Sequence, residues 1–288
     1  MNSRIRFKMN KLGGGDIPAL IALSASIGWD YDEQEINTIM TVGTVYGHKT
    51  EQGELISSAA IIPYRDNLAS IGMVIVNKAY RGYGLGRELT QTCVQSVSNE
   101  VTIMLIATKE GKPLYESLGF QEVSCVHKFL RENDTSLYFG DEQHEFDILP
   151  IADIHFTQVH ALDQSAVGAD REVFLQNRIR QAKQGIVVKE KTGKTVGYGL
   201  SVETPYNVIL GPVVAINQNV AAAIINHFAK GYRGRLRIDV PDEQRFFLPY
   251  LEKCGFQKVS QPPIMIKNAG QLPQRNRTLY GIAAQIYG

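Results

Sequence analysis

Three alternating glycines between an apolar run and an amphipathic helix constrain this sequence more than any other feature. The run Leu68–Val76 is followed by Arg81-Gly82-Tyr83-Gly84-Leu85-Gly86. Leu85, Leu89 and Cys93 then recur four residues apart, which is the spacing of one helix face. Glycines let backbone N–H groups converge, and a helix N-terminus carries partial positive charge. We therefore predict a strand, an anion-binding loop suited to a pyrophosphate, and a helix.

Two other phosphate-binding motifs do not fit this glycine loop, residues 81–86. A Walker loop ends in Gly-Lys-Ser/Thr, whereas Gly86 is followed by Arg87 and Glu88. A dinucleotide fingerprint needs a third glycine at Arg87 and a βαβ unit, but the preceding strand-like runs form a meander. A glycine-rich turn without a ligand is the plain alternative, although three glycines lose much chain entropy for a simple connection.

The order of the predicted elements occurs twice. Each half has three strand-like runs, a helix, a further strand and a helix that ends at Gly-Phe, at Gly119-Phe120 and at Gly255-Phe256. A chain of 288 residues commonly forms two domains. We predict an α+β fold in which a mixed, mostly antiparallel sheet is flanked by helices. The domains are expected at residues 1–132 and 148–288, with a linker at 133–147.

Composition favours a small-molecule partner. Lys plus Arg number 30 and Asp plus Glu 29, so there is no basic excess for nucleic acid or an anionic membrane. Cys93, Cys125 and Cys254 have neither disulfide-framework nor metal-ligand spacing, which predicts no metal site and fits a reducing compartment. The sequence shows no signal-peptide core and no run that could span a bilayer. We therefore expect a cytoplasmic protein.

The glycine loop resembles the Arg/Gln-x-x-Gly-x-Gly/Ala signature of the GNAT superfamily of N-acetyltransferases. Pro113-Leu114-Tyr115-Glu116-Ser117-Leu118-Gly119-Phe120 is similar to the family's Leu-Tyr-Glu-x-x-Gly-Phe segment. The resemblance implies acetyl-CoA as acyl donor and direct transfer of its acetyl group to an amine. It also implies the following cofactor contacts: Val74, Ile75, Val76, Arg81, Gly82, Tyr83, Gly84, Leu85, Gly86, Arg87 and Thr108.

Tyr115 falls where the family places a tyrosine beside the cofactor sulfur, so the resemblance implies that Tyr115 is catalytic. A thiol has a pKa of about 8.5 and a tyrosine a pKa of about 10, so transfer of the tyrosine proton to the departing thiolate is uphill by about 2 kcal/mol. A hydrogen bond donated by the tyrosine to the sulfur therefore suffices. A core aromatic of the short helix is the alternative. Thr108 stands where the family usually has Asn, and it keeps a hydroxyl but loses the amide.

The second half has the same predicted order of elements as the first but lacks the residues of its motifs. Residues 213–219 occupy the place of the glycine loop and contain no glycine. The tyrosine position holds Leu251, with Tyr250 beside it. This half resembles the degenerate second domain of tandem bacterial GNAT proteins, so we predict no second cofactor and expect this half to shape the acceptor site.

Trp29, the only tryptophan, lies in a predicted break between the first two helices, where the family admits the acceptor. We predict that it lines the acceptor site, although a half-buried aromatic at the edge of the core is equally compatible. An amine acceptor also requires a base, and the sequence singles out none of the following candidates: Asp30, Asp32, Glu33, His48, Glu54 and Glu116. Asp170, Arg171 and Asp239 could reach an acceptor at a domain interface, or could be capping and surface groups.

Together these features predict an acetyl-CoA-dependent N-acetyltransferase that acts on a primary amine of a small molecule. The alternative is a non-catalytic regulator that binds acyl-CoA. A nucleic-acid or protein-interaction module finds little support in the near-neutral charge.

Overall fold

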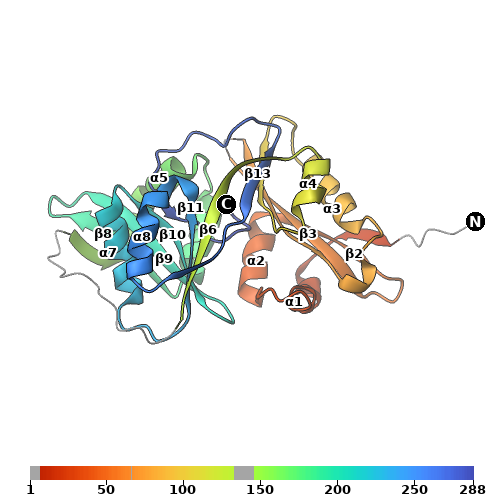
Figure 1. Cartoon of the computed structure of the whole chain (residues 1–288), viewed down its shortest axis with the longest axis horizontal. Helices are drawn as coiled ribbons and strands as arrows, with labels where there is room; N and C mark the ends of the chain where they lie inside the picture. Colours follow the sequence, from red (N-terminus) through yellow and green to blue (C-terminus); the bar gives the residue numbers. More distant parts are fainter. Residues whose placement is uncertain (1–6, 66, 133–145) are drawn as a thin grey trace, which may run out of the picture.

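A computed structural model describes residues 7–65, 67–132 and 146–288 and shows two halves side by side (Figure 1). The first half contains β1 (Lys8–Lys11), α1 (Ile17–Ala25), α2 (Glu33–Val42), β2 (Thr44–Lys49), β3 (Leu55–Tyr64), β4 (Leu68–Val76), α3 (Leu85–Gln95), β5 (Thr102–Ile106), α4 (Lys112–Ser117) and β6 (Gln121–Arg131). The second half contains β7 (Phe146–Pro150), α5 (Phe156–Val167), α6 (Glu172–Gln181), β8 (Gln184–Glu190), β9 (Thr195–Glu203), β10 (Val208–Ala215), α7 (Gln218–Ala229), β11 (Leu236–Pro241), α8 (Leu248–Lys253), β12 (Gln257–Ser260), β13 (Pro263–Lys267) and β14 (Leu279–Gly281).

The predicted fold class is confirmed, because the described strands form one mostly antiparallel sheet that helices flank. Residues 133–145 of the predicted linker lie outside the described residues, and Phe146 and Asp147 begin β7. The single helix predicted at Asp242–Lys253 is instead a 3₁₀ turn followed by α8. Pro249 accounts for this break, since proline fits the first turn of a helix but not its interior.

Side-chain spacing and caps explain the two helices that border the site. In α2, the carboxylate of Asp32 accepts the backbone N–H of Glu35 at 2.8 Å, and Ile36 and Ile39 bury one face. In α3, Leu85 and Leu89 are buried, as the four-residue spacing predicted. These helices lie on opposite faces of the first half's sheet, since their buried side chains join different core clusters.

The two halves exchange strands at the centre of the sheet. β13 of the second half lies between β5 and β6 of the first half and pairs antiparallel with both. β6 pairs in turn with β11 and β12 of the second half. Both β6 and β13 lie at the junction of the halves in Figure 1. Because each half completes the sheet of the other, separating them would break backbone pairing in both.

The segment of residues 279–288, here called the closing segment, runs from the second half into the first. Its strand β14 pairs with β10, and the N–H of Ile282 donates to the carbonyl of Asp239 on β11 at 2.9 Å. Further along, the hydroxyl of Ser70 donates to the carbonyl of Ile286 at 2.7 Å, and that of Tyr64 to the carbonyl of Tyr287 at 2.8 Å. The closing segment therefore fixes the two halves relative to each other.

A buried ion pair adds to this junction. Arg178 of α6 donates from Nη1 to Oε2 of Glu35 in α2 at 2.5 Å and from Nη2 to the carbonyl of Ala283 at 2.8 Å. The amide of Gln181 also donates to Glu35, at 2.8 Å. Removing one partner of a buried pair costs about 3–5 kcal/mol, so this contact holds α2 against α6.

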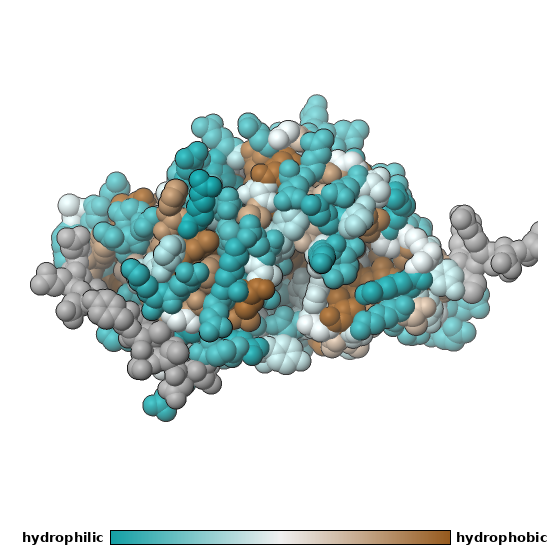
Figure 2. Space-filling view, in the orientation of Figure 1, coloured by the Kyte–Doolittle hydropathy of each residue, from teal (hydrophilic) through white to brown (hydrophobic). Residues whose placement is uncertain are grey.

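The visible surface is mostly hydrophilic, with small apolar patches separated by polar side chains (Figure 2). Among the described residues, every helix is too short or too polar to cross a membrane.

Candidate active site

The glycine loop presents open backbone at the start of α3. Gly82 and Gly84 have φ values of 87° and 81°, in the left-handed region that glycine adopts without strain. A Cβ built on either glycine would meet no other atom within 4 Å. The space above this backbone is therefore clear, and the first N–H groups of α3 have no partner within the helix. The loop has the geometry of an anion cradle.

Strands β4 and β5 separate next to this loop. They pair in parallel only where Leu68–Ile71 face Thr102–Leu105, although β4 continues to Val76. Met73 has a φ of 53° at a bulge in β4, and the hydroxyl of Ser58 donates to its carbonyl at 2.9 Å. Beyond Ile71 the edge of β4 that faced β5 is unpaired in this register. An extended ligand can enter the divergence and use that edge as if adding a strand.

The residues predicted to contact the cofactor lie around these two features. Those of the loop are mainly exposed, while Val74 and Val76 are half-buried on β4. A Cβ on Gly86 would lie 3.5 Å from Cγ2 of Val76, so loop and strand are adjacent. Among the predicted contacts, only Ile75 and Leu85 are buried. Their side chains pack in the interior, so only their backbone could contact a ligand. The contact of all these residues with acetyl-CoA stays a prediction.

Thr108 and Tyr115 lie together at the end of β5. The hydroxyl of Thr108 accepts the N–H of Gly111 at 3.0 Å. Thr108 also lines a pocket between the two halves, here called the main pocket and described below. A Cβ on Gly111 would lie 3.1 Å from Cε2 of Tyr115 and 3.3 Å from Oγ1 of Thr108. Burial, and then the neighbouring Cys93, raise the pKa of Tyr115. Its hydroxyl has no hydrogen-bond partner among the described residues, its ring packs with Leu89, Cys93 and Phe120, and Tyr115 is absent from the lining of the main pocket.

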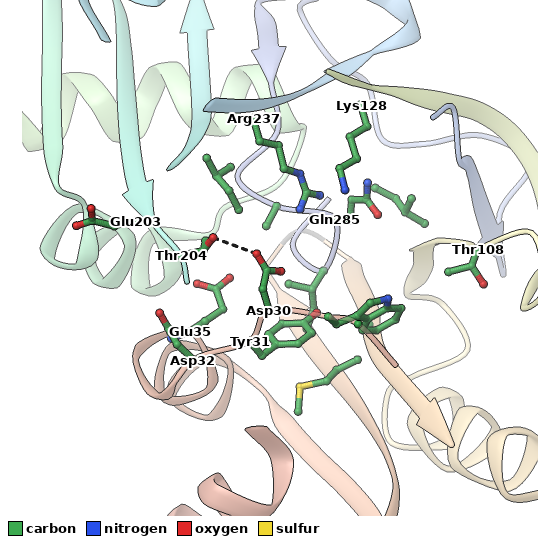
Figure 3. Close-up of a pocket in the computed structure, with 18 of the residues that line it drawn as sticks. Asp30, Tyr31, Asp32, Glu35, Thr108, Lys128, Glu203, Thr204, Arg237 and Gln285 are labelled. Carbon is green, nitrogen blue, oxygen red and sulfur yellow. Dashed lines mark hydrogen bonds between the residues drawn. The ribbon is translucent and has the colours of Figure 1, made fainter. Parts of the chain in front are cut away.

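The main pocket lies between the halves and has a volume of about 190 Å³. It reaches the divergence of β4 and β5 at Ile71, Gly72 and Ile106. The closing segment forms another part of its wall. Figure 3 shows the polar side chains that line it. They are Asp30, Tyr31, Asp32, Glu35, Thr108, Lys128, Glu203, Thr204, Arg237 and Gln285.

Trp29 lies where it was predicted, in the connection between α1 and α2, and it lines this pocket. It is half-buried and lies beside Tyr31, with ring centroids 6.2 Å apart. The pocket position favours the acceptor interpretation of Trp29, although contact with an acceptor stays a prediction.

The structure divides the candidate bases into two groups. Asp30 and Asp32 line the pocket. Burial raises the pKa of Asp32, whose side chain also caps α2. The remaining candidates are absent from the lining: Glu33, Glu54 and Glu116 are exposed, and His48 is fully buried under α3.

Three other acidic or basic groups were considered from sequence. Asp239 is buried beside the pocket and accepts two hydrogen bonds from Arg237, at 2.6 and 3.1 Å. Asp170 and Arg171 line a different hollow, next to Tyr64. Sequence reasoning missed Lys128, Arg237 and Gln285, because strand pairing and the closing segment, not local spacing, bring them to the pocket.

None of the three cysteines has the environment of a nucleophile. Burial raises the pKa of Cys93 to about 12 and also raises the pKa values of Cys125 and Cys254.

Cys125 lies in a cluster with His127 and Asp242. One possible metal-ligand atom of each of the three side chains lies within 4.8 Å of the other two. Both partners approach the same nitrogen of His127, the thiol at 4.0 Å and the carboxylate at 2.8 Å. A nucleophilic triad needs them on different ring nitrogens, so the cluster lacks that geometry.

In the second half, the regions that correspond to the glycine loop and the strand divergence are filled. Asn217 caps α7, and its Oδ1 accepts the N–H of Val220 at 3.0 Å. β10 and β11 pair in parallel only at Val208 and Ile209, and then β14 pairs with β10 in the space beyond. A Cβ on Gly211 would lie 2.0 Å from the carbonyl oxygen of Ile282. The chain thus occupies the second cleft itself.

These features define a GNAT-type acyltransferase, and the chain belongs to that family. Two family models, each described as "Acetyltransferase (GNAT) domain", match residues 30–131 and 159–281. The tandem GNAT arrangement predicted from the glycine loop and the repeated order of elements is therefore confirmed, as is an acyltransferase enzyme.

Individual relatives agree along the whole chain. The uncharacterized N-acetyltransferase YitH of Bacillus subtilis is 34% identical over 279 residues, which cover 96% of this chain and 97% of the relative. A Pyrococcus horikoshii structure named for an acetyltransferase has a TM-score of 0.80 at 19% identity, covering 100% of this chain and 99% of that one. A tandem GNAT protein from the clavulanic acid biosynthesis pathway has a TM-score of 0.68 at 12% identity, with coverages of 92% and 100%. The two structures support the fold alone.

Proposed function

We propose that this protein is an acetyl-CoA-dependent N-acetyltransferase whose acceptor is a primary amine of a small molecule. The main support is that the pocket between the halves opens onto the divergence of β4 and β5 beyond Ile71, and that β4 continues from there to Val76, which adjoins the glycine loop. A thioester carried along β4 would therefore end at the wall of the pocket. We also propose residues 1–132 as the cofactor domain and residues 148–288 as the domain that shapes the acceptor site.

The residues of the first half fit acetyl-CoA. The open backbone at Gly82 and Gly84 suits the pyrophosphate, and the unpaired edge of β4 suits the pantetheine arm. When bound, acetyl-CoA supplies the activated acetyl thioester. The chain's task is to present a neutral amine to it and to stabilise the departing sulfur.

A carboxylate in the pocket meets the first requirement. An amine with a pKa of about 10.4 is neutral about once in two thousand at neutral pH, which costs about 4.5 kcal/mol. Asp30 and Asp32 are the sequence-derived candidates that line the pocket. The amine nitrogen forms a bond to the carbonyl carbon, the carbon–sulfur bond breaks, and the amine proton passes to the base.

Tyr115 meets the second requirement. Its raised pKa keeps the phenol protonated across neutral and mildly alkaline pH, and its hydroxyl is free of other described partners. A hydrogen bond from this hydroxyl stabilises negative charge as it develops on sulfur in a site shielded from water. Direct transfer needs no acyl-enzyme, which agrees with the raised pKa values of all three thiols.

The test is release of free CoA from acetyl-CoA, measured with a thiol reagent across amino acids, polyamines, amino sugars and peptides. We expect release that depends on one class of amine, with the acetylated amine identified by mass spectrometry. Binding of acetyl-CoA without amine-dependent release across the panel would instead identify a non-catalytic acyl-CoA-binding protein.

A further inference from the structure

Two cationic side chains converge on one part of the pocket. Lys128 of β6 faces Asp239 of β11 in the strand register, and Arg237 lies two residues before Asp239. Side chains two residues apart on a strand share a face, so Lys128 and Arg237 lie on the same side of the sheet. Figure 3 shows both reaching toward the same region as the amide of Gln285.

Lys128 has no hydrogen bond or ion pair with any described residue, although it is half-buried. Burial, and then the neighbouring Arg237, lower the pKa of Lys128, and the more weakly acting Asp239 and Asp30 offset only part of this shift. Arg237 is only partly neutralised: Nε and Nη2 both donate to one oxygen of Asp239, at 3.1 and 2.6 Å, and Nη1 has no described partner. Uncompensated charge in such a site is costly unless a ligand pairs with it.

Carboxylates of the described residues lie near these cations without forming an ion pair with Lys128, so the pocket can take a ligand with both signs of charge. Asp239 accepts both hydrogen bonds of Arg237, and Asp30 accepts hydrogen bonds from Thr204 and Asn207 at 3.0 and 3.3 Å. Figure 3 shows Asp30 below Arg237. Besides Lys128 and Arg237, which is paired with Asp239, the lining contains the carboxylates of Asp30 and Asp32, so groups of both signs face the pocket, which suits a zwitterion better than a dianionic phosphate.

The other acidic groups of the lining are engaged elsewhere. Glu35 pairs with Arg178 at 2.5 Å and Glu203 with Lys183 at 2.8 Å. Asp32 uses one oxygen to cap α2. None of these groups faces Lys128 closely enough to form an ion pair in the described structure, so they do not supply its missing anion.

We propose that the acceptor is an amine that also carries a carboxylate, an amino acid or one of its derivatives. Its carboxylate lies between Nζ of Lys128 and Nη1 of Arg237, within reach of the amide of Gln285, and its amino group lies on the side of Asp30. This inference names the substrate class and rests on the proposed acetyl transfer, but the binding site it describes can be tested without turnover.

Trp29 provides that test, because it is the only tryptophan and it lines the pocket. Its fluorescence is titrated with the common amino acids and with the primary amide of each, which removes the carboxylate charge and keeps the amine. We expect at least one amino acid to change the fluorescence and to bind about 10-fold tighter than its amide. Equal binding of acid and amide, or no binding by any amino acid, overturns the proposal.

The variant Lys128→Met identifies the residue responsible. It should weaken binding of the amino acid about 10-fold and leave binding of its amide within about twofold. Lys194→Met is the matched control, because Lys194 is exposed in the turn between β8 and β9, and it should change neither affinity. An equal loss for acid and amide in Lys128→Met would show general disruption of the pocket and overturn the assignment.

The same amines are then assayed for CoA release, which separates the two claims. Amino acids that bind but release no CoA refute the proposed function and leave the carboxylate site standing. CoA release confined to amines without a carboxylate refutes the site and leaves the proposed function standing.

Discussion

The two halves share one order of elements but differ in what fills the cleft between their two central parallel strands. In the first half, β4 and β5 diverge into the main pocket, and the N-terminus of α3 is open above Gly82 and Gly84. In the second half, β14 lies in the corresponding divergence and Asn217 caps α7. Two halves with the same order of elements can therefore differ in whether the chain itself fills the cleft between the parallel strands.

The two halves also differ in the side chains that lie beneath α3 and beneath its counterpart α7. In the first half, Nδ1 of His48 is 2.8 Å from the hydroxyl of Ser57, and Nε2 is 3.4 Å from Glu88 in the first turn of α3. In the second half, the equivalent strand pair is Val188 and Gly197, which pack in an apolar core. Polar groups thus accompany the open cleft, and apolar packing accompanies the filled one.

The largest effect is expected from closing the open cradle. Gly84→Ala places a side chain in the cleared space and strains a left-handed backbone, so two charge-assisted hydrogen bonds to the pyrophosphate should be lost. We expect acetyl-CoA affinity to fall about 1,000-fold, measured by titration calorimetry. Gly193→Ala is the control: Gly193 has a φ of 86° and open space, but it lies in a turn of the second half. Equal weakening in both variants would refute a role for the cradle.

Tyr115 distinguishes the halves chemically. Tyr115→Phe removes the free hydroxyl and should lower kcat about 100-fold while leaving the dissociation constant of acetyl-CoA unchanged. Tyr250→Phe is the matched substitution in the second half, where the hydroxyl donates to Asn226 at 2.6 Å, and it should leave kcat unchanged. An unaltered kcat in Tyr115→Phe would assign that tyrosine to the core alone.

Because the chain itself fills the cleft between β10 and β11, a substitution there should lower the free energy of unfolding without changing the binding of acetyl-CoA. In Gly211→Ala, the new Cβ would lie 2.0 Å from the carbonyl oxygen of Ile282, which is closer than two such atoms can approach without a shift of the backbone. We expect the free energy of unfolding to fall by about 2 kcal/mol in chemical denaturation, with acetyl-CoA stoichiometry unchanged. A variant that gains a second acetyl-CoA would show that β14 merely competes with a functional site.

The smallest effect concerns His48. Burial lowers the pKa of His48 below its ordinary value of 6.5, even though Glu88 opposes the shift. As pH falls through the ordinary value, the unfolded chain takes up the proton first, so the folded state loses stability until pH passes the lowered pKa. As the pH falls below 6.5 this group should therefore lower the free energy of unfolding. His48→Gln should remove that part of the pH dependence, and an identical pH profile would contradict it.

Local patterns in the sequence predicted the fold class, the helices of the first half and the glycine loop, because these depend on residue spacing and glycine conformation. The exchange of β6 and β13 was not predictable in this way, since it depends on pairing between strands far apart in the chain. The same holds for β14, a strand of three residues whose position is set by the cleft it fills.

The candidate site divides along the same line. Trp29 was identified from the predicted break between two helices, Thr108 from the family resemblance, and Asp30 as one of several possible bases, and all three line the pocket. Lys128 and Arg237 were missed because other charged residues also lie on their strands and nothing local distinguishes these two, and only the register of β6 with β11 brings them together.

The central claim is that only the first half binds acetyl-CoA. Titration calorimetry of the whole chain with acetyl-CoA tests it most directly. The structure predicts one acetyl-CoA per chain, with binding abolished or strongly weakened in Gly84→Ala and retained in Gly193→Ala. A stoichiometry of two, or full-strength binding in Gly84→Ala, would contradict it.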